Sequence, residues 1–207
     1  MRFSLALAAL LGAALALLAE AIAAPPVRAQ DCATETPKDD IRVPEAQALY
    51  DCISDSLYKS FQGSGVKEAA EYRDWSYAST SPYLSATHGS RFVVNLINDI
   101  GKKAYLDFLD QGLKMPVGTI AAKESFTIDR TGKVKRGPLF FMEKAERGAL
   151  PDTNDWKYTL ILPNGKVMGV TGTETGVKVK FCHDCHAAVA DTQDSMLYLP
   201  EEYRVQR

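Results

Sequence analysis

Apolar residues recur at helical spacing in two segments of the chain. The first segment begins at Pro44, a residue suited to a first helical turn, and continues to Phe61 before Gly63. The second runs from about Ser90 to Gln111 and is followed by Gly112, a typical C-cap residue. The pattern predicts two helices, the first of them within an N-terminal helical arm of about residues 30–66.

Beyond Gly118 the apolar period changes to two. Alternation over residues 120–128 predicts a strand, and further strands are expected at 139–144, at 156–162 and near 166–172. Turn sequences separate them, and Asn164-Gly165 is a strong hairpin signal. Successive strands with short turns predict an antiparallel meander. The expected fold class is therefore α+β, a mainly antiparallel β-sheet with N-terminal helices and a C-terminal helix.

The first residues have the layout of a secretory signal peptide. Arg2 supplies the positive start, residues 3–18 carry no charge, and residues 27–29 offer a small-residue cleavage site. The uncharged run is shorter than the roughly 20 residues that span a membrane. We expect residues 1–29 to be removed and residues 30–207 to form a single periplasmic domain without a membrane span.

Charge composition and cysteine positions indicate which partners and which redox compartment to expect. The chain has 24 basic and 26 acidic residues and no basic stripe, which argues against binding to nucleic acid. In an exported protein, Cys32 and Cys52 are expected to form a disulfide, with two free thiols as the alternative. Such a bond would close a loop of about 20 residues and contribute about 3 kcal/mol.

The other two cysteines belong to Cys182-His183-Asp184-Cys185-His186, which matches the C-x-x-C-H signature of covalent haem attachment. Two thiols three positions apart can each bond a vinyl group of the porphyrin, and the following histidine ligates the iron. The motif predicts one haem c, bonded to Cys182 and Cys185 and held by His186. His183 is expected to be solvated. A zinc site would need two further ligands, and a thioredoxin-like pair would need a βαβ pattern, which the sequence lacks.

The sixth position of the iron is left open by the sequence. A Met or His there is typical of electron carriers, whereas an empty position admits small molecules. A structural or capping role explains His88 better than ligation does, and packing explains the methionines equally well. The candidate ligands are His88, Met115, Met142, Met168 and Met196.

From about Trp75 to the C-terminus, the chain resembles the cytochrome P-460 family and its relative cytochrome c-prime beta. The likeness rests on five features in this order: Arg91, the stretch Pro116-Val117-Gly118-Thr119-Ile120-Ala121-Ala122-Lys123-Glu124, the stretch Met142-Glu143-Lys144, Asp155-Trp156, and the late C-x-x-C-H motif. The resemblance implies a mainly antiparallel β domain with helices, usually a homodimer.

The same resemblance assigns roles to three further residues. The family lysine that is bonded to the porphyrin edge corresponds to Lys123, and strand alternation directs this residue away from Phe126. Arg91 corresponds to a distal arginine and Glu174 to a distal carboxylate that accepts protons. The alternatives are an exposed strand residue for Lys123 and ordinary surface charges for Arg91 and Glu174.

Three functions follow from this resemblance as expectations. The first is an oxidoreductase that acts on hydroxylamine or nitric oxide at an open distal site and passes electrons to a soluble cytochrome. The second is a non-enzymatic binder of nitric oxide or carbon monoxide, with Phe126, Phe140 and Phe141 available for an apolar pocket. The third is a simple electron carrier with six-coordinate iron.

Overall fold

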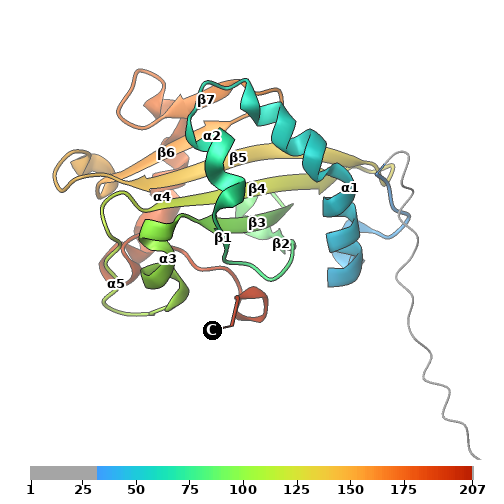
Figure 1. The fold of residues 1–207 in the computed structure, drawn as a ribbon, viewed down its shortest axis with the longest axis horizontal. Helices are drawn as coiled ribbons and strands as arrows, with labels where there is room; N and C mark the ends of the chain where they lie inside the picture. Colours follow the sequence, from blue (N-terminus) through green and yellow to red (C-terminus); the bar gives the residue numbers. More distant parts are fainter. Residues whose placement is uncertain (1–31, 207) are drawn as a thin grey trace, which may run out of the picture.

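The computed structural model describes residues 32–206, and within them seven strands form one antiparallel sheet (Figure 1). The order is β1-β3-β4-β5-β6-β7, with β2 also paired with β3. The strands are β1 (Ser76–Tyr77), β2 (Tyr83–Ser85), β3 (Arg91–Ile97), β4 (Ile120–Ile128), β5 (Val134–Lys144), β6 (Trp156–Ile161) and β7 (Val167–Val170). The expected α+β class with a mainly antiparallel sheet is confirmed.

Strands β4 to β7 are consecutive neighbours, so the predicted meander is confirmed. The Asn164-Gly165 turn joins β6 to β7, and Gly165 has a φ of 81°. A Cβ at this position would also lie 2.7 Å from the carbonyl oxygen of Ser60. Glycine is therefore required here both by the turn conformation and by the close approach of the first helix.

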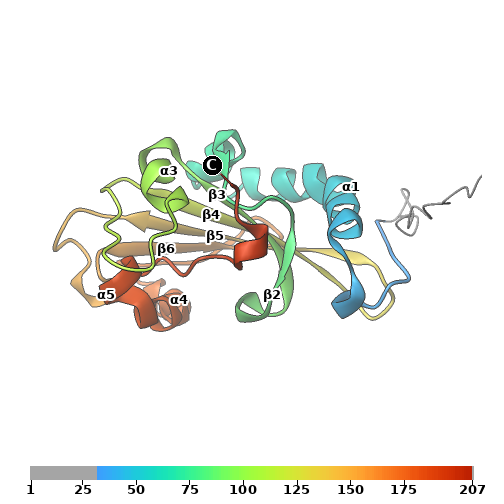
Figure 2. The ribbon, with the colours of Figure 1, turned by 90° about the horizontal axis from the view of Figure 1, so that it is seen from below.

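Helix α1 (Val43–Gln62) covers one face of the sheet, and α4 (Lys180–His186) and α5 (Ala190–Gln193) lie on the other (Figure 2). Pro44 lies in the first turn of α1, and Gly63 follows its last residue, as predicted. The predicted disulfide between Cys32 and Cys52 is confirmed, with a Cα–Cα distance of 5.7 Å, and it ties the start of the described chain to α1. The remaining helices are α2 (Glu68–Glu71), α3 (Asp99–Leu106) and short 3₁₀ turns.

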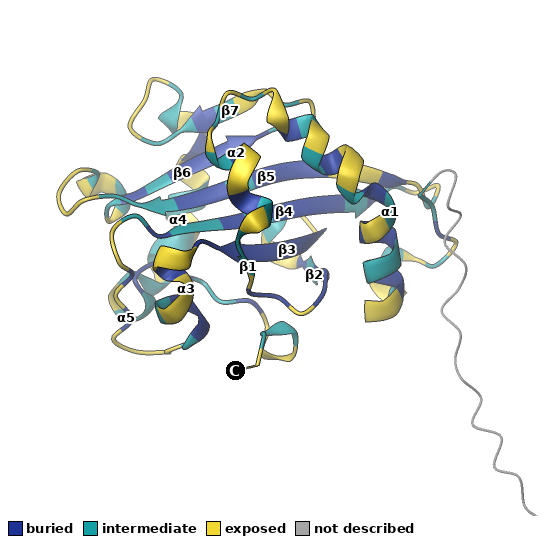
Figure 3. Cartoon of the chain, in the orientation of Figure 1, coloured by how far each residue is buried: buried dark blue, intermediate teal, exposed yellow. Residues whose placement is uncertain are grey.

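Both faces of the sheet are buried, as the dark strands in Figure 3 show. Alternate residues of β4 and β5 contribute to two different hydrophobic clusters. Phe126 and Phe141 pack beneath α1, whereas Met142 and Tyr158 pack with the C-terminal segment. The sheet is therefore the middle of three layers, with its meander strands fixed on both sides.

The predicted helix from Ser90 to Gln111 is wrong. Residues 91–97 form strand β3, and only Asp99–Leu106 are helical. A strand buried on both faces has a nearly continuous apolar run, in which helical spacing appears by coincidence. The helix starts at Asn98, whose side chain accepts a hydrogen bond from the Gly101 backbone N–H at 3.1 Å. Ile100, an apolar residue of the segment predicted to be helical, is 56% exposed.

The predicted signal peptide, residues 1–29, lies outside the described residues. Within residues 32–206, no helix combines the length and apolar character needed to cross a membrane.

Candidate functional site

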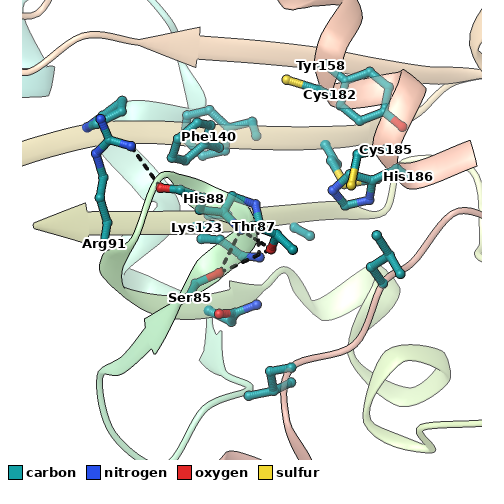
Figure 4. Close-up of a pocket in the computed structure, with 18 of the residues that line it drawn as sticks. Ser85, Thr87, His88, Arg91, Lys123, Phe140, Tyr158, Cys182, Cys185 and His186 are labelled. Atoms are coloured by element: carbon teal, nitrogen blue, oxygen red, sulfur yellow. Dashed lines mark hydrogen bonds between the residues drawn. The ribbon is translucent and has the colours of Figure 1, made fainter. Parts of the chain in front are cut away.

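The C-x-x-C-H motif lies on α4, beside a cavity of about 890 Å³ between this helix and the sheet (Figure 4). This volume lies within the range of about 300–1,000 Å³ that is typical of ligand sites. Cys182 is half-buried and Cys185 is exposed, and neither forms a disulfide. Both cysteines and His186 line the cavity, so the motif presents its reactive groups to one space.

His186 is oriented by the chain itself. Its Nδ1 lies 2.8 Å from the carbonyl oxygen of Ser195, to which it donates a hydrogen bond. Burial lowers the pKa of His186 to about 4, so the ring is neutral near pH 7. A histidine with its Nδ1 proton fixed in this way leaves the Nε2 lone pair available to a metal. The side chain thus has the tautomer that the predicted axial role requires.

The turn that supplies this carbonyl group is held by partners from three other segments. The Trp156 indole N–H donates to the Asp194 carbonyl at 2.8 Å, and Lys144 pairs with the Asp194 carboxylate at 2.7 Å. The same carboxylate accepts the Met115 backbone N–H at 2.8 Å. Asp194 and Ser195 have φ values of 47° and 65°, a conformation that is rare without glycine. No local motif marks this turn, so the turn could not be predicted from the sequence.

Lys123 projects from β4 into the cavity, on the face opposite Phe126, as strand alternation predicted. Its Nζ lies 3.3 Å from Nε2 of His88. Burial lowers the pKa of Lys123 to about 8. Lys123 is therefore a half-buried amine on the cavity wall, and the alternative of an exposed strand residue does not hold.

His88 also faces the cavity, from the 3₁₀ turn Ala86–His88 between β2 and β3. Its Nδ1 lies 2.9 Å from Ser85 Oγ and 3.1 Å from Thr87 Oγ1, and its ring meets Phe140 edge-on at 5.5 Å between centroids. Burial, followed by the nearby positive charge of Lys123, lowers the pKa of His88 to about 2. The ring is consequently neutral and anchored on one side.

Arg91 lines the same cavity but is the first residue of β3, not a helix residue. Its Nη1 donates to the carbonyl oxygen of His88 at 2.8 Å. A Cβ on Gly89 would lie 2.1 Å from this nitrogen, and Gly89 has a φ of 71°. Glycine at position 89 therefore allows Arg91 to hold the His88 turn.

The structure does not bring Glu174 into the cavity. This residue is exposed in the turn after β7 and is absent from the cavity lining. Phe126, suggested for a pocket lining, is buried beneath α1 instead, whereas Phe140 and Phe141 line the cavity. Among the candidate methionines, three line the cavity and Met115 does not: the three are Met142, Met168 and Met196.

Three buried polar atoms in or beside the motif lack protein partners. Within residues 32–206, the Tyr158 hydroxyl, Nδ1 of His183 and Oγ of Ser195 form no hydrogen bond. The Tyr158 ring packs 5.8 Å from that of His186 and 6.2 Å from that of His183, so His183 is half-buried rather than solvated. Tyr158 also lines the cavity, and a buried hydroxyl without a partner is typical of a site that receives a further group.

The thiol pair, the oriented His186 and the adjoining cavity together fit a covalently attached haem. No cluster of three or more His, Cys, Asp or Glu side chains that could hold a metal ion occurs in the described part of the chain, so the zinc alternative has no ligand set there. No protein-family model matches the sequence, and no curated protein is significantly similar to it. The function must therefore be argued from the site.

Proposed function

We propose that this chain is an exported c-type haem protein of the P-460 type, which oxidises hydroxylamine or turns over nitric oxide and passes electrons to a soluble cytochrome. One observation carries the proposal: the C-x-x-C-H helix and Lys123 line the same cavity. These are the two features that the P-460 resemblance joins, although they lie 59 positions apart, from 123 to 182.

In this proposal Cys182 and Cys185 hold the haem and His186 ligates its iron. The haem supplies the redox chemistry, and the chain supplies binding, orientation and the electrostatic surroundings. Lys123, an amine whose pKa is lowered to about 8 by burial, would lie at the porphyrin edge, where the P-460 resemblance implies a bonded lysine. The Ser195 carbonyl keeps His186 in the ligating tautomer.

The cellular setting is proposed on separate grounds. A disulfide such as Cys32–Cys52 persists in oxidising compartments, which supports export to the periplasm together with the expected signal peptide. A soluble cytochrome is the electron acceptor that such a location would offer. Homodimer formation is proposed from the P-460 resemblance alone.

A gas-binding cytochrome of the c-prime beta type is the second candidate. The apolar part of the cavity wall favours it, since Phe140, Leu160 and Leu162 all line the cavity. In this function the haem would bind nitric oxide or carbon monoxide without turnover, and Lys123 would remain unbonded. A simple electron carrier is the third candidate, and it requires that no small molecule reach the iron.

The proposal is tested by intact mass and ferrous absorption spectra of the protein matured in a haem-attaching host. We expect a mass increase of one haem, a Soret band shifted far to the red, and loss of that shift in Lys123→Ala. Lys135→Ala, an exposed lysine of β5, is the matched control and should leave the spectrum unchanged.

Three results would change the conclusion. An ordinary c-type spectrum that is identical in wild type and Lys123→Ala, without hydroxylamine oxidation, would favour the gas binder. Absence of any haem adduct would contradict the whole class. Failure to bind nitric oxide or carbon monoxide in either oxidation state would leave only the electron carrier.

A further inference from the structure

We infer that Arg204 binds a propionate carboxylate of the haem, at the end of the cavity that lies away from the C-x-x-C-H helix. The inference rests on the proposed haem attachment and deepens it, because it assigns a partner to the negatively charged edge of the cofactor. In a haem, the two vinyl groups that the cysteines bond and the two propionates lie on opposite edges of the ring. A haem anchored on α4 would therefore direct its carboxylates toward the far end of the cavity.

The sheet register defines this far end. Helix α4 packs over β6, where the Tyr158 ring lies 5.8 Å from that of His186. Four residues that line the cavity are cross-strand partners in a single row: Leu160 of β6, Phe140 of β5, Lys123 of β4 and Asn95 of β3. Neighbouring strands lie about 4.8 Å apart, so this row spans about 14 Å. The end of the cavity away from the motif is thus at β3.

Arg204 lies at this β3 end. Ser79, which follows β1, forms an antiparallel bridge with Arg204, and the backbone N–H of Val205 donates to the Ala78 carbonyl at 3.2 Å. Ala78 in turn donates its N–H to the Asn95 carbonyl at 2.8 Å. Figure 2 shows the C-terminal segment running from α5 across this face of the sheet toward β2. Arg204 lines the cavity from this segment.

The half-buried guanidinium of Arg204 is held in a fixed orientation. Its Nε donates to the Leu199 carbonyl at 3.1 Å, and its Cζ lies over the rings of Phe108 and Tyr198, 4.9 and 5.4 Å from their centroids. Within residues 32–206 its two terminal nitrogens form no hydrogen bond, and no carboxylate lies within ion-pair distance of them. A guanidinium fixed through Nε presents these nitrogens as donors to a carboxylate.

The charge of the cavity wall also favours an anion. Arg91, Lys123 and Arg204 line the cavity, whereas no Asp or Glu of the described chain does so. None of the three basic residues forms an ion pair within residues 32–206. A haem brings two carboxylates into a wall that has basic groups and no acidic ones, so the cofactor matches the cavity in charge as well as in size.

Two other roles for Arg204 make different predictions. Arg204 could act only as a fastener of the C-terminal segment, through Leu199 and the two aromatic rings. It could also bind a free oxyanion such as nitrite, since a guanidinium binds small oxyanions through the same donors. Only the propionate role predicts that the carboxylates of the bound haem respond to replacement of Arg204.

The test is infrared redox-difference spectroscopy of the holoprotein, matured with haem whose propionates carry ¹³C. The label-sensitive carboxylate bands are expected to shift in Arg204→Gln and to return toward the wild-type position in Arg204→Lys, which keeps the charge. Arg136→Gln is the matched control, because Arg136 is an exposed residue of β5 outside the cavity lining. It should leave these bands unchanged.

The reduction potential gives a second readout. A propionate without its cation adds uncompensated negative charge near the iron and favours the ferric form. At the midpoint potential of the wild type, the ratio of ferrous to ferric haem should therefore fall by about threefold or more in Arg204→Gln. The Arg136→Gln control should keep the ratio, because its charge is exposed and screened by solvent and salt.

Three results would overturn the inference. Propionate bands that do not shift in Arg204→Gln, in a variant that is only less stable in urea, would assign Arg204 to fastening the C-terminal segment. Unshifted bands together with weaker nitrite binding would assign it to a free anion. Both results leave haem attachment intact, whereas absence of any haem adduct would contradict the proposed function and this inference with it.

Discussion

Lys123 and Glu124 are neighbours in β4 but point to opposite faces of the sheet. The charged group on one face has a partner of opposite charge, and the charged group on the other face does not. Glu124 is 1% exposed beneath α1 and accepts hydrogen bonds from the Tyr50 and Tyr72 hydroxyls, both at 2.6 Å, and from the Arg73 guanidinium. Lys123, on the cavity face, meets the neutral imidazole of His88 instead of a carboxylate.

The contrast separates a compensated charge from an uncompensated one. The charge of the Glu124 carboxylate is compensated by an arginine and two hydroxyl donors. The hydrogen-bond network joins α1, the turn that carries Tyr72 and Arg73, and the sheet. Lys123, in contrast, is a half-buried amine without an opposite charge at hydrogen-bond distance, and its burial costs free energy. Side chains with strongly shifted pKa values are frequent at functional sites. The α1 face thus stabilises the fold, and the opposite face carries the site that we propose binds haem.

The largest effect on stability is expected from Glu124→Ala. Arg73 and two tyrosine hydroxyls would lose their shared partner, and breaking one side of a buried ion pair costs about 3–5 kcal/mol. Urea unfolding of the variant measures the loss. Glu143→Ala, which removes a more exposed ion pair with Lys157, is the matched control and should cost about 1 kcal/mol or less. A loss below that control value would show that the α1 face does not depend on this network.

The Cys32→Ser/Cys52→Ser double variant comes next. Opening a loop of 20 residues is expected to lower the free energy of unfolding by about 3 kcal/mol, because the unfolded chain regains entropy. The haem spectrum should stay as in the wild type, since the disulfide lies on the α1 side of the sheet. A changed spectrum would mean that the two faces are coupled.

A pH series sharpens the comparison further, with the haem-free Cys182→Ala/Cys185→Ala protein as the reference. The pKa of Lys123 falls from 10.5 to about 8 on folding, so between these values the unfolded chain binds the extra proton. Stability should therefore rise with pH over this window, by up to about 1.4 kcal/mol per pH unit. Adding Lys123→Met should abolish the rise.

Above pH 10 the tyrosines on both faces should act in the opposite direction, since burial also raises the pKa of Tyr158 on the cavity face. Burial, and then the neighbouring Glu124 carboxylate, raise the pKa of Tyr50 and Tyr72 above their usual value of 10. Above pH 10 the unfolded chain loses protons that the folded chain keeps, so stability should fall. A Lys123→Met variant whose stability still rises between pH 8 and 10 would show that another group is responsible.

Features of the fold and of the candidate site can be predicted from the sequence where the partners of a residue are local. The meander, α1, the disulfide and the side of β4 that carries Lys123 follow from periodicity and turn residues. Strand β3 was mistaken for a helix because burial on both faces removes the alternation that marks a strand. The Asp194–Ser195 turn was not found, because its partners come from distant segments.

The smallest effect is expected from Glu174→Gln, which bears on the distal carboxylate that the P-460 resemblance assigned. Glu174 is exposed and outside the cavity lining, so its replacement should change stability by no more than about 0.5 kcal/mol. Hydroxylamine turnover and cyanide affinity should likewise stay at the wild-type level. The measurement is a parallel titration of the variant and the wild type. A large loss of turnover in Glu174→Gln alone would mean that the turn after β7 moves to the cavity once haem is attached, and that proton transfer depends on this carboxylate.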